Sequence, residues 1–148
     1  MPGKTLKVLW VSKHKLLREE QRQLHAYAER HGLELQLDTF PQKLPSIEWL
    51  VHRKVLPGGY DVVIAVLPLT MTAQLAELAQ HHGFQLWRPR VGLLHYDRKL
   101  PCPDYDEDRD ILSPAADADG KAVYVHKRFL HFEKVVAVEV VAEPVTTP

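Results

Sequence analysis

Five polar side chains lie directly after two apolar stretches of the chain, where they could act together on a ligand. They are Ser12, Lys13, His14, Thr70 and Thr72. Hydroxyl groups donate and accept hydrogen bonds, a lysine carries a fixed positive charge, and an imidazole changes its charge near neutral pH. This combination predicts a site for a phosphate or carboxylate group. The competing interpretation is structural, because Ser12 and Thr70 also stand where helix caps are expected, and Lys13 and His14 could be solvated loop residues.

A repeated pattern of hydrophobicity would position these residues. Three times within residues 1–85, a short apolar stretch is followed by a stretch with helical spacing of its apolar side chains. The predicted strands cover residues 5–12, 33–38 and 61–67, and a short fourth strand covers 84–87. Alternating β and α segments favour right-handed crossovers and a parallel sheet with helices on both faces. The sequence therefore predicts an α/β, Rossmann-like, three-layer domain.

The ends of the predicted strands define the expected binding site. In the usual order the first strand lies between the second and the third, and ligands bind in the crevice at the carboxyl ends of parallel strands. Helix N-termini at that edge add unpaired N–H groups that attract anions. The second strand ends at Asp38 and Thr39, which join the set. The predicted ligand-binding residues are Ser12, Lys13, His14, Asp38, Thr39, Thr70 and Thr72.

The repeated pattern stops after the fourth strand. Arg88, Pro89 and Arg90 interrupt any helix that would follow it. Residues 99–121 are rich in Asp and contain several prolines, a composition that disfavours a compact fold for this segment. We therefore predict a long, acidic, exposed loop over 99–121.

The C-terminal part of the chain returns to strand-like composition. Residues 122–127 and 129–142 are rich in Val and aromatic residues, which predicts antiparallel strands that extend the sheet or form a ribbon against a second subunit. Residues 143–148 are predicted to be a frayed tail. Residues 1–148 have the size of one ordinary domain, so a single α/β domain is the expectation.

Sequence motifs for common cofactors are missing. The turn over residues 11–15, after the first strand, has no glycine, whereas a dinucleotide-binding turn needs glycines beside the pyrophosphate. Gly3, Lys4 and Thr5 resemble part of a phosphate-binding loop, but they precede the first strand instead of following it. No cofactor is therefore predicted.

The residues that could bind a metal are poorly spaced. Although the chain has 9 histidines, the adjacent His81 and His82 do not easily share one face of a helix. The acidic run that begins at Asp104 imitates a calcium loop, but Arg109 occupies the place of the required glycine. Cys102 is the only cysteine, which excludes an internal disulfide and a multi-cysteine zinc site. No metal site is predicted.

Composition narrows the classes of partner. Lys plus Arg and Asp plus Glu both total 19, so no overall field attracts extended nucleic acid or an anionic membrane. Hydrophobic residues make up 45% and the longest apolar runs are strand-sized, which predicts a cytoplasmic protein without a membrane segment. Basic and aromatic residues alternate around residues 87–99 and 127–131, and pairing with the acidic loop explains them better than binding of single-stranded nucleic acid.

Three functional hypotheses follow from these residues. The leading one is a binding or regulatory module, a homodimer through its C-terminal strands, that recognises an anionic small molecule such as a nucleotide at the ends of the first and third strands. The second is an enzyme of the phosphodiesterase or nuclease type, with His14 as general acid or base, Lys13 stabilising charge and Ser12 orienting the substrate. The third is a non-catalytic protein-interaction module. The sequence leaves open whether the chain is an enzyme.

Overall fold

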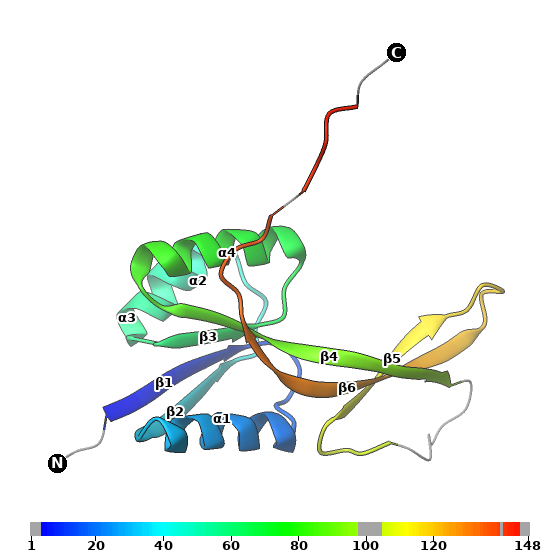
Figure 1. Cartoon of the computed structure of the whole chain (residues 1–148), viewed down its shortest axis with the longest axis horizontal. Helices are drawn as coiled ribbons and strands as arrows, with labels where there is room; N and C mark the ends of the chain where they lie inside the picture. Colours follow the sequence, from blue (N-terminus) through cyan, green and yellow to red (C-terminus); the bar gives the residue numbers. More distant parts are fainter. Residues whose placement is uncertain (1–3, 98–104, 140, 146–148) are drawn as a thin grey trace.

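A computed structural model describes residues 4–97, 105–139 and 141–145, and these form a mixed sheet with helices on both faces (Figure 1). The sheet has 6 strands in the order β2-β1-β3-β4-β6-β5. The predicted α/β character is confirmed, and so is the position of the first strand between the second and the third. The sheet is only half parallel, however, because β4-β6 and β6-β5 are antiparallel pairs.

The parallel half of the sheet forms the centre of the molecule. Its first three strands are β1 (Lys4–Val11), β2 (Leu33–Phe40) and β3 (Val62–Ala65). All four residues of β3 are buried, as the continuous apolar run predicts for a strand covered on both faces. The last residue of β1, Val11, lies opposite Phe40 of β2 and Ala65 of β3. The three strands therefore end at one edge, which we call the carboxyl rim.

Helices pack on both faces of this half and enclose two hydrophobic clusters. Below the sheet in Figure 1 lies α1 (Arg18–Arg30), and above it lie α4 (Leu69–His82) and a continuous helical segment made of α2 (Ile47–Leu50), the π-helix η1 (Val51–Val55) and α3 (Leu56–Gly58). Leu24 of α1 packs with Val8 and Ile64, and all three are fully buried. The clusters hold the strands, and hence the carboxyl rim, in place.

The fourth strand is much longer than the sequence analysis predicts. β4 (Gln85–Asp97) continues through Arg88, Pro89 and Arg90, so the expected end at residue 87 is wrong. β3 pairs with β4 only as far as Trp87, and beyond that point β4 is paired on one side alone, with β6. A proline is tolerated there because its missing N–H can face the unpaired side of the strand.

The segment predicted as a long loop contains a strand. β5 (Asp110–Ala116) pairs antiparallel with β6 (Ala122–Lys134), and the turn between them has Gly120 in the left-handed region at φ 77°. The exposed-loop prediction for 99–121 is therefore corrected over 110–116, and part of its remainder, 99–104, lies outside the described residues. Asp110 joins the strand because Arg128, its register partner on β6, pairs with its carboxylate.

The C-terminal strand also differs from its prediction. β6 is one strand that ends at Lys134, in place of two that reach residue 142, and it is paired on both sides, with β4 and β5. Together β4, β5 and β6 form a twisted ribbon that projects beyond the carboxyl rim (Figure 1). After β6 the chain crosses α4, and it has no strand pairing over 135–139 and 141–145. Residues 143–145 are exposed, while the end of the predicted frayed tail, 146–148, lies outside the described residues.

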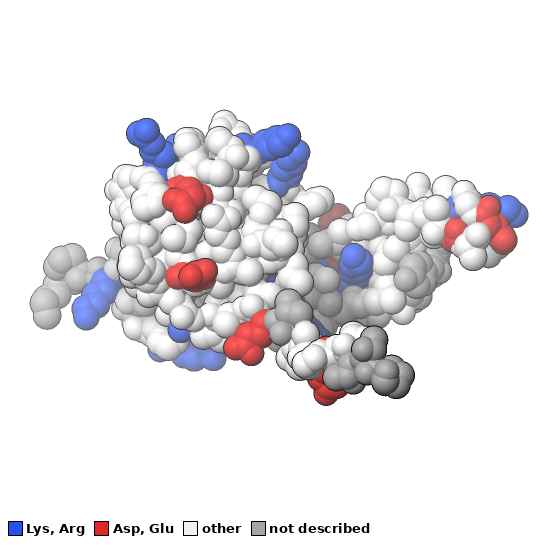
Figure 2. Space-filling view, turned by 90° about the horizontal axis from the view of Figure 1, so that it is seen from above, with Lys and Arg blue, Asp and Glu red and all other residues white. Residues whose placement is uncertain are grey.

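Charged side chains of both signs are distributed over the molecule. On the face that Figure 2 shows, Lys and Arg residues alternate with Asp and Glu residues and form no continuous basic patch. Within the described ranges, no helix has the length and hydrophobicity needed to cross a bilayer.

Candidate functional site

The loop after β1 is held in a defined turn at the carboxyl rim. The indole Nε1 of Trp10 donates a hydrogen bond of 2.9 Å to the backbone oxygen of His14, and the backbone N–H of His14 donates one of 3.1 Å to the hydroxyl of Ser12. Trp10 is itself buried in the core cluster between the sheet and α1. The core therefore fixes the backbone of this loop, while the side chains of Lys13 and His14 are exposed.

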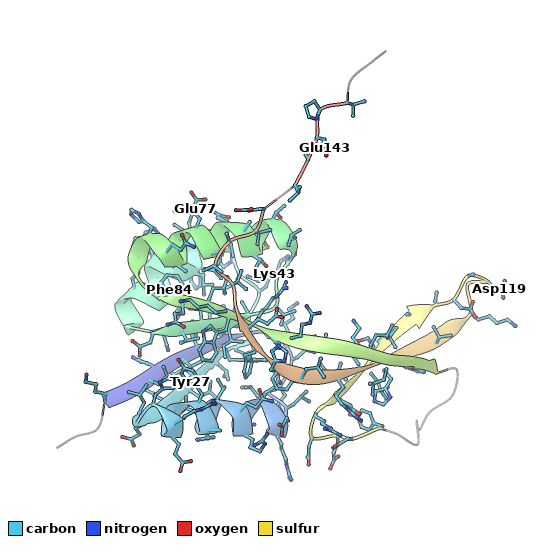
Figure 3. All side chains as sticks on the ribbon, viewed as in Figure 1. Tyr27, Lys43, Glu77, Phe84, Asp119 and Glu143 are labelled. Atoms are coloured by element: carbon cyan, nitrogen blue, oxygen red, sulfur yellow. The ribbon has the colours of Figure 1, made fainter. Side chains whose placement is uncertain are left out.

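A cavity of about 500 Å³ lies between the ends of β1, β2 and β3, on the α4 side of the sheet. We call it the tip cavity. Its polar lining residues are Ser12, Lys13, His14, Gln42 and Lys43, and its remaining lining residues are apolar. Lys43 comes from the loop after β2 and is labelled in Figure 3. No Asp or Glu side chain lines the cavity, so its charged groups favour an anion.

The structure brings together three of the seven predicted ligand-binding residues. Ser12, Lys13 and His14 line the tip cavity, but the two threonines at the start of α4 do not. Thr70 is exposed, and the buried hydroxyl of Thr72 donates to the backbone oxygens of Leu67 and Pro68. Thr72 therefore serves the first turn of its own helix.

The two residues predicted at the end of β2 do not line the tip cavity either. β2 continues to Phe40, so Asp38 and Thr39 lie inside the strand and the loop reaches the rim two residues later than expected. Asp38 accepts a hydrogen bond of 2.7 Å from the hydroxyl of Tyr60. Burial, together with this bond to a carboxylate, raises the pKa of Tyr60 to about 12. Sequence reasoning missed Lys43 because it ended the second strand too early.

A second cavity, of about 430 Å³, lies on the opposite side of the same loop, between the start of α1 and the strand ribbon. We call it the ribbon cavity. It shares Ser12, His14 and Val66 with the tip cavity. Its other charged or titratable lining residues are Lys15, Glu20, Tyr105 and Lys127.

Glu20 is the unusual group of the ribbon cavity. Its side chain is buried, with the residue only 4% exposed, and its Oε1 accepts a hydrogen bond of 2.8 Å from the backbone N–H of Leu17. Burial raises the pKa of Glu20 to about 7, because the bond from Leu17 only partly offsets the loss of water. A charged side chain within an amphipathic helix is usually expected on its solvated face. The position of Glu20 at the third residue of the helix, where a Glu can reach back to the cap, was the available signal.

Ser12 and His14 are joined through the backbone of the loop. The hydroxyl of Ser12 accepts from the backbone of His14, and within the described ranges no hydrogen bond joins that hydroxyl to the imidazole of His14. The described part of the chain likewise holds no group of three or more His, Cys, Asp or Glu side chains arranged for a metal ion, and Cys102 lies outside it.

The basic and aromatic stretches have acidic partners nearby. Arg88 and Arg90 lie 3.2 Å and 3.6 Å from the carboxylate of Glu133, and Arg128 lies 2.7 Å from Asp110. Pairing with the acidic segment, as predicted, therefore holds for Arg128, whereas Arg88 and Arg90 pair within the ribbon. Arg98 and Lys99 lie outside the described residues.

Comparisons with protein-family models, with curated proteins and with solved structures found no match. The functional conclusion therefore depends on the two cavities at the carboxyl rim.

Proposed function

We propose that this chain is a ligand-binding or regulatory domain that recognises an anionic small molecule such as a nucleotide in the tip cavity. The observation that supports it is the composition of the cavity wall. Lys13, Lys43 and the titratable His14 converge from two loops at the ends of adjacent parallel strands, and no carboxylate lies among them. The Rossmann-like assignment belongs to the same proposal.

Position and size both favour a small ligand. The cavity lies where open α/β sheets bind ligands, and its volume falls within the range usual for small-molecule sites. Pro68 and Met71, at the start of α4, also line the cavity. The first turn of a helix presents N–H groups without partners inside the helix, so an anion here gains hydrogen bonds as well as charge pairing.

The strength of binding should depend on the lysines. A hydrogen bond between charged groups contributes about 1.5 to 3 kcal/mol when water is partly excluded, and less at an exposed site. Because Lys13 and Lys43 are exposed, we expect the lower end of this range for each. Affinity should also fall as salt concentration rises, since screening weakens exposed charges most.

Calorimetric titration with inorganic pyrophosphate and with adenosine monophosphate tests the proposal. Lys13→Ala and Lys43→Ala should each weaken binding about tenfold, which corresponds to about 1.4 kcal/mol. Lys121→Ala is the matched control, because Lys121 is also an exposed lysine but lies at the far turn of the ribbon. Equal binding by all three variants, or no binding by the wild-type protein, would contradict the proposal.

The same samples separate binding from catalysis. A regulatory site returns the nucleotide unchanged, whereas the phosphodiesterase hypothesis requires cleavage of a phosphodiester substrate that stops in a His14→Ala variant. We expect the nucleotide to be recovered intact, as binding without turnover predicts.

A further inference from the structure

Glu20 presents one oxygen that its helix cap does not use. The cap requires only Oε1, which accepts from the N–H of Leu17, and within the described ranges Oε2 has no hydrogen-bond partner. Glu20 also lines the ribbon cavity, although the residue is 96% buried. Oε2 is not fully enclosed by protein atoms, so a ligand in the ribbon cavity can reach it.

The walls around Glu20 are suited to a flat, apolar body. The indole of Trp10, the ring of Tyr105 and the side chains of Leu17 and Val91 line the cavity, which is large enough for a heterocyclic ring. Aromatic side chains at such a position can stack on or abut a base. Lys15 and Lys127 also line the cavity, and their positive charges would attract a negatively charged group elsewhere on the same ligand.

The chemistry of the carboxyl group narrows the kind of ring. No lysine or arginine forms an ion pair with Glu20 within the described ranges, and a buried carboxyl without a cationic partner favours its neutral form. A neutral carboxylic acid presents a donor beside an acceptor. Its complement is an acceptor beside a donor, such as the ring nitrogen and amino group of adenine or cytosine, or the carbonyl oxygen and ring N–H of guanine or uracil.

We infer that the ribbon cavity binds the base of a nucleotide that presents a hydrogen-bond acceptor beside a donor, with Glu20 pairing to that edge. This inference rests on the proposed function for the position of the ligand's phosphate group, which the tip cavity would bind. The two cavities share Ser12, His14 and Val66, so one ligand can place its phosphate in the tip cavity and its base in the ribbon cavity on the other side of the loop.

Adenosine, which has a base but no phosphate, tests the ribbon cavity by itself. In calorimetric titrations the full-length protein should bind adenosine more tightly than purine riboside, which keeps the ring nitrogens but lacks the amino group. Glu20→Met should weaken adenosine binding about tenfold or more, because it removes both hydrogen bonds. Glu29→Met, on the exposed side of the same helix, is the matched control and should leave binding unchanged.

A second variant separates loss of pairing from loss of folding. Glu20→Gln keeps the acceptor for the cap and places an N–H donor where the acid had its O–H, so it should retain adenosine binding. Wild-type binding should weaken as the pH rises from 6 to about 8.5 and Glu20 ionises, whereas binding by Glu20→Gln should stay constant. Other titratable groups also face the cavity: Lys15 and His14 from the loop, Tyr105 from the segment before β5, and Lys127 from β6. Because they are unchanged in Glu20→Gln, a pH dependence that persists in this variant would overturn the assignment to Glu20.

The two proposals fail in different ways. If pyrophosphate binds with the predicted dependence on Lys13 and Lys43 but adenosine does not bind, the base site is overturned and the proposed function stands. If adenosine binds equally well to the wild-type protein and to Glu20→Met, the base site is also overturned. If adenosine binding depends on Glu20 and pyrophosphate does not bind, the base site is supported while the phosphate site fails.

Discussion

Nε2 of His126 lies 2.7 Å from Oδ2 of Asp110, and both side chains are buried between the strands of the ribbon and the segment that leads into β5. The same carboxylate accepts hydrogen bonds from Nε and Nη2 of Arg128, at 2.7 Å and 2.9 Å, and from the backbone N–H of Asp106. Tyr105 packs its ring 5.9 Å from that of His126, measured between centroids. This network joins β5, β6 and the preceding segment, and it positions Tyr105 at the ribbon cavity.

Loss of the Asp110 charge should destabilise the ribbon. Asp110→Asn leaves Arg128 without its carboxylate and replaces one acceptor by a donor, and breaking a buried ion pair in this way costs about 2 to 4 kcal/mol. Urea unfolding should report this loss. Asp119→Asn, at the exposed turn of the ribbon labelled in Figure 3, should change the free energy of unfolding by less than about 0.5 kcal/mol. Equal effects of the two substitutions would show that the network contributes nothing.

Acidic pH should weaken the same network by protonating Asp110. Burial alone would raise the pKa of Asp110, but the bonds from Arg128, from the N–H of Asp106 and from His126 together hold it well below its usual range. A lowered carboxyl pKa contributes stability above the unfolded value, near 3.8, and this contribution is lost as the pH falls further. Urea midpoints measured between pH 5 and 2.5 should therefore fall less steeply in Asp110→Asn than in the wild-type protein.

Glu20 should have the opposite effect on stability. Its pKa is raised from 4.5 to about 7, so its contribution is greatest below pH 4.5 and is lost as the pH rises through 7. Between pH 5 and 8 the wild-type protein should lose about 2 kcal/mol relative to Glu20→Gln, which keeps the cap but cannot ionise. Parallel stability profiles of the two proteins over this range would contradict the burial of an ionisable Glu20.

The bond between Tyr60 and Asp38 should be structural. Tyr60→Phe removes one hydrogen bond to a carboxylate and should cost about 1 kcal/mol in urea unfolding without changing pyrophosphate binding. The raised pKa also means that stability falls as the pH rises from 10 towards 12, because the unfolded chain loses its phenolic proton first. Absorbance titration of the phenolate should show one late-titrating tyrosine that is missing from the variant.

Oligomeric state tests the predicted homodimer. β6 is paired on both sides, so within the C-terminal segment predicted to form the dimer, the described residues after β6 remain for pairing, with Val141 94% and Val145 96% exposed. Light scattering should report twice the mass of one chain, and Val141→Lys with Val145→Lys should shift it towards the monomer. Leu56→Lys, a charge added at another exposed apolar side chain, should not. A wild-type monomer at high concentration would rule out the dimer.

Local sequence patterns predicted the parallel half of the fold well because burial on both faces requires continuous apolar runs. β1 and β2 begin and end within two residues of the predicted bounds, and β3 is shorter because Val66 lies at the rim with 57% exposure. The tip cavity lies at the strand ends where the crevice was predicted, but only Ser12, Lys13 and His14 of the predicted residues line it.

Longer-range contacts determined what the sequence did not reveal. Pro89 is compatible with β4 only because β3 has already ended beside it, and Asp110 is compatible with β5 only because Arg128 and His126 pair with it. Glu20 likewise lines a cavity only because of the ribbon, whose lining residues, from Pro89 to Lys127, come much later in the chain. No local pattern contains these contacts.

The most direct test of the account is a titration of ¹⁵N-labelled protein with pyrophosphate, followed by the shifts of its backbone amide signals. The anion site at the carboxyl rim predicts that the largest changes fall on residues 12–14, 42–44 and 67–71, from the three loops that form the tip cavity. It also predicts that these changes are lost in the Lys13→Ala, Lys43→Ala double variant. Changes confined to the ribbon, or an unchanged spectrum at saturating pyrophosphate, would contradict the central claim.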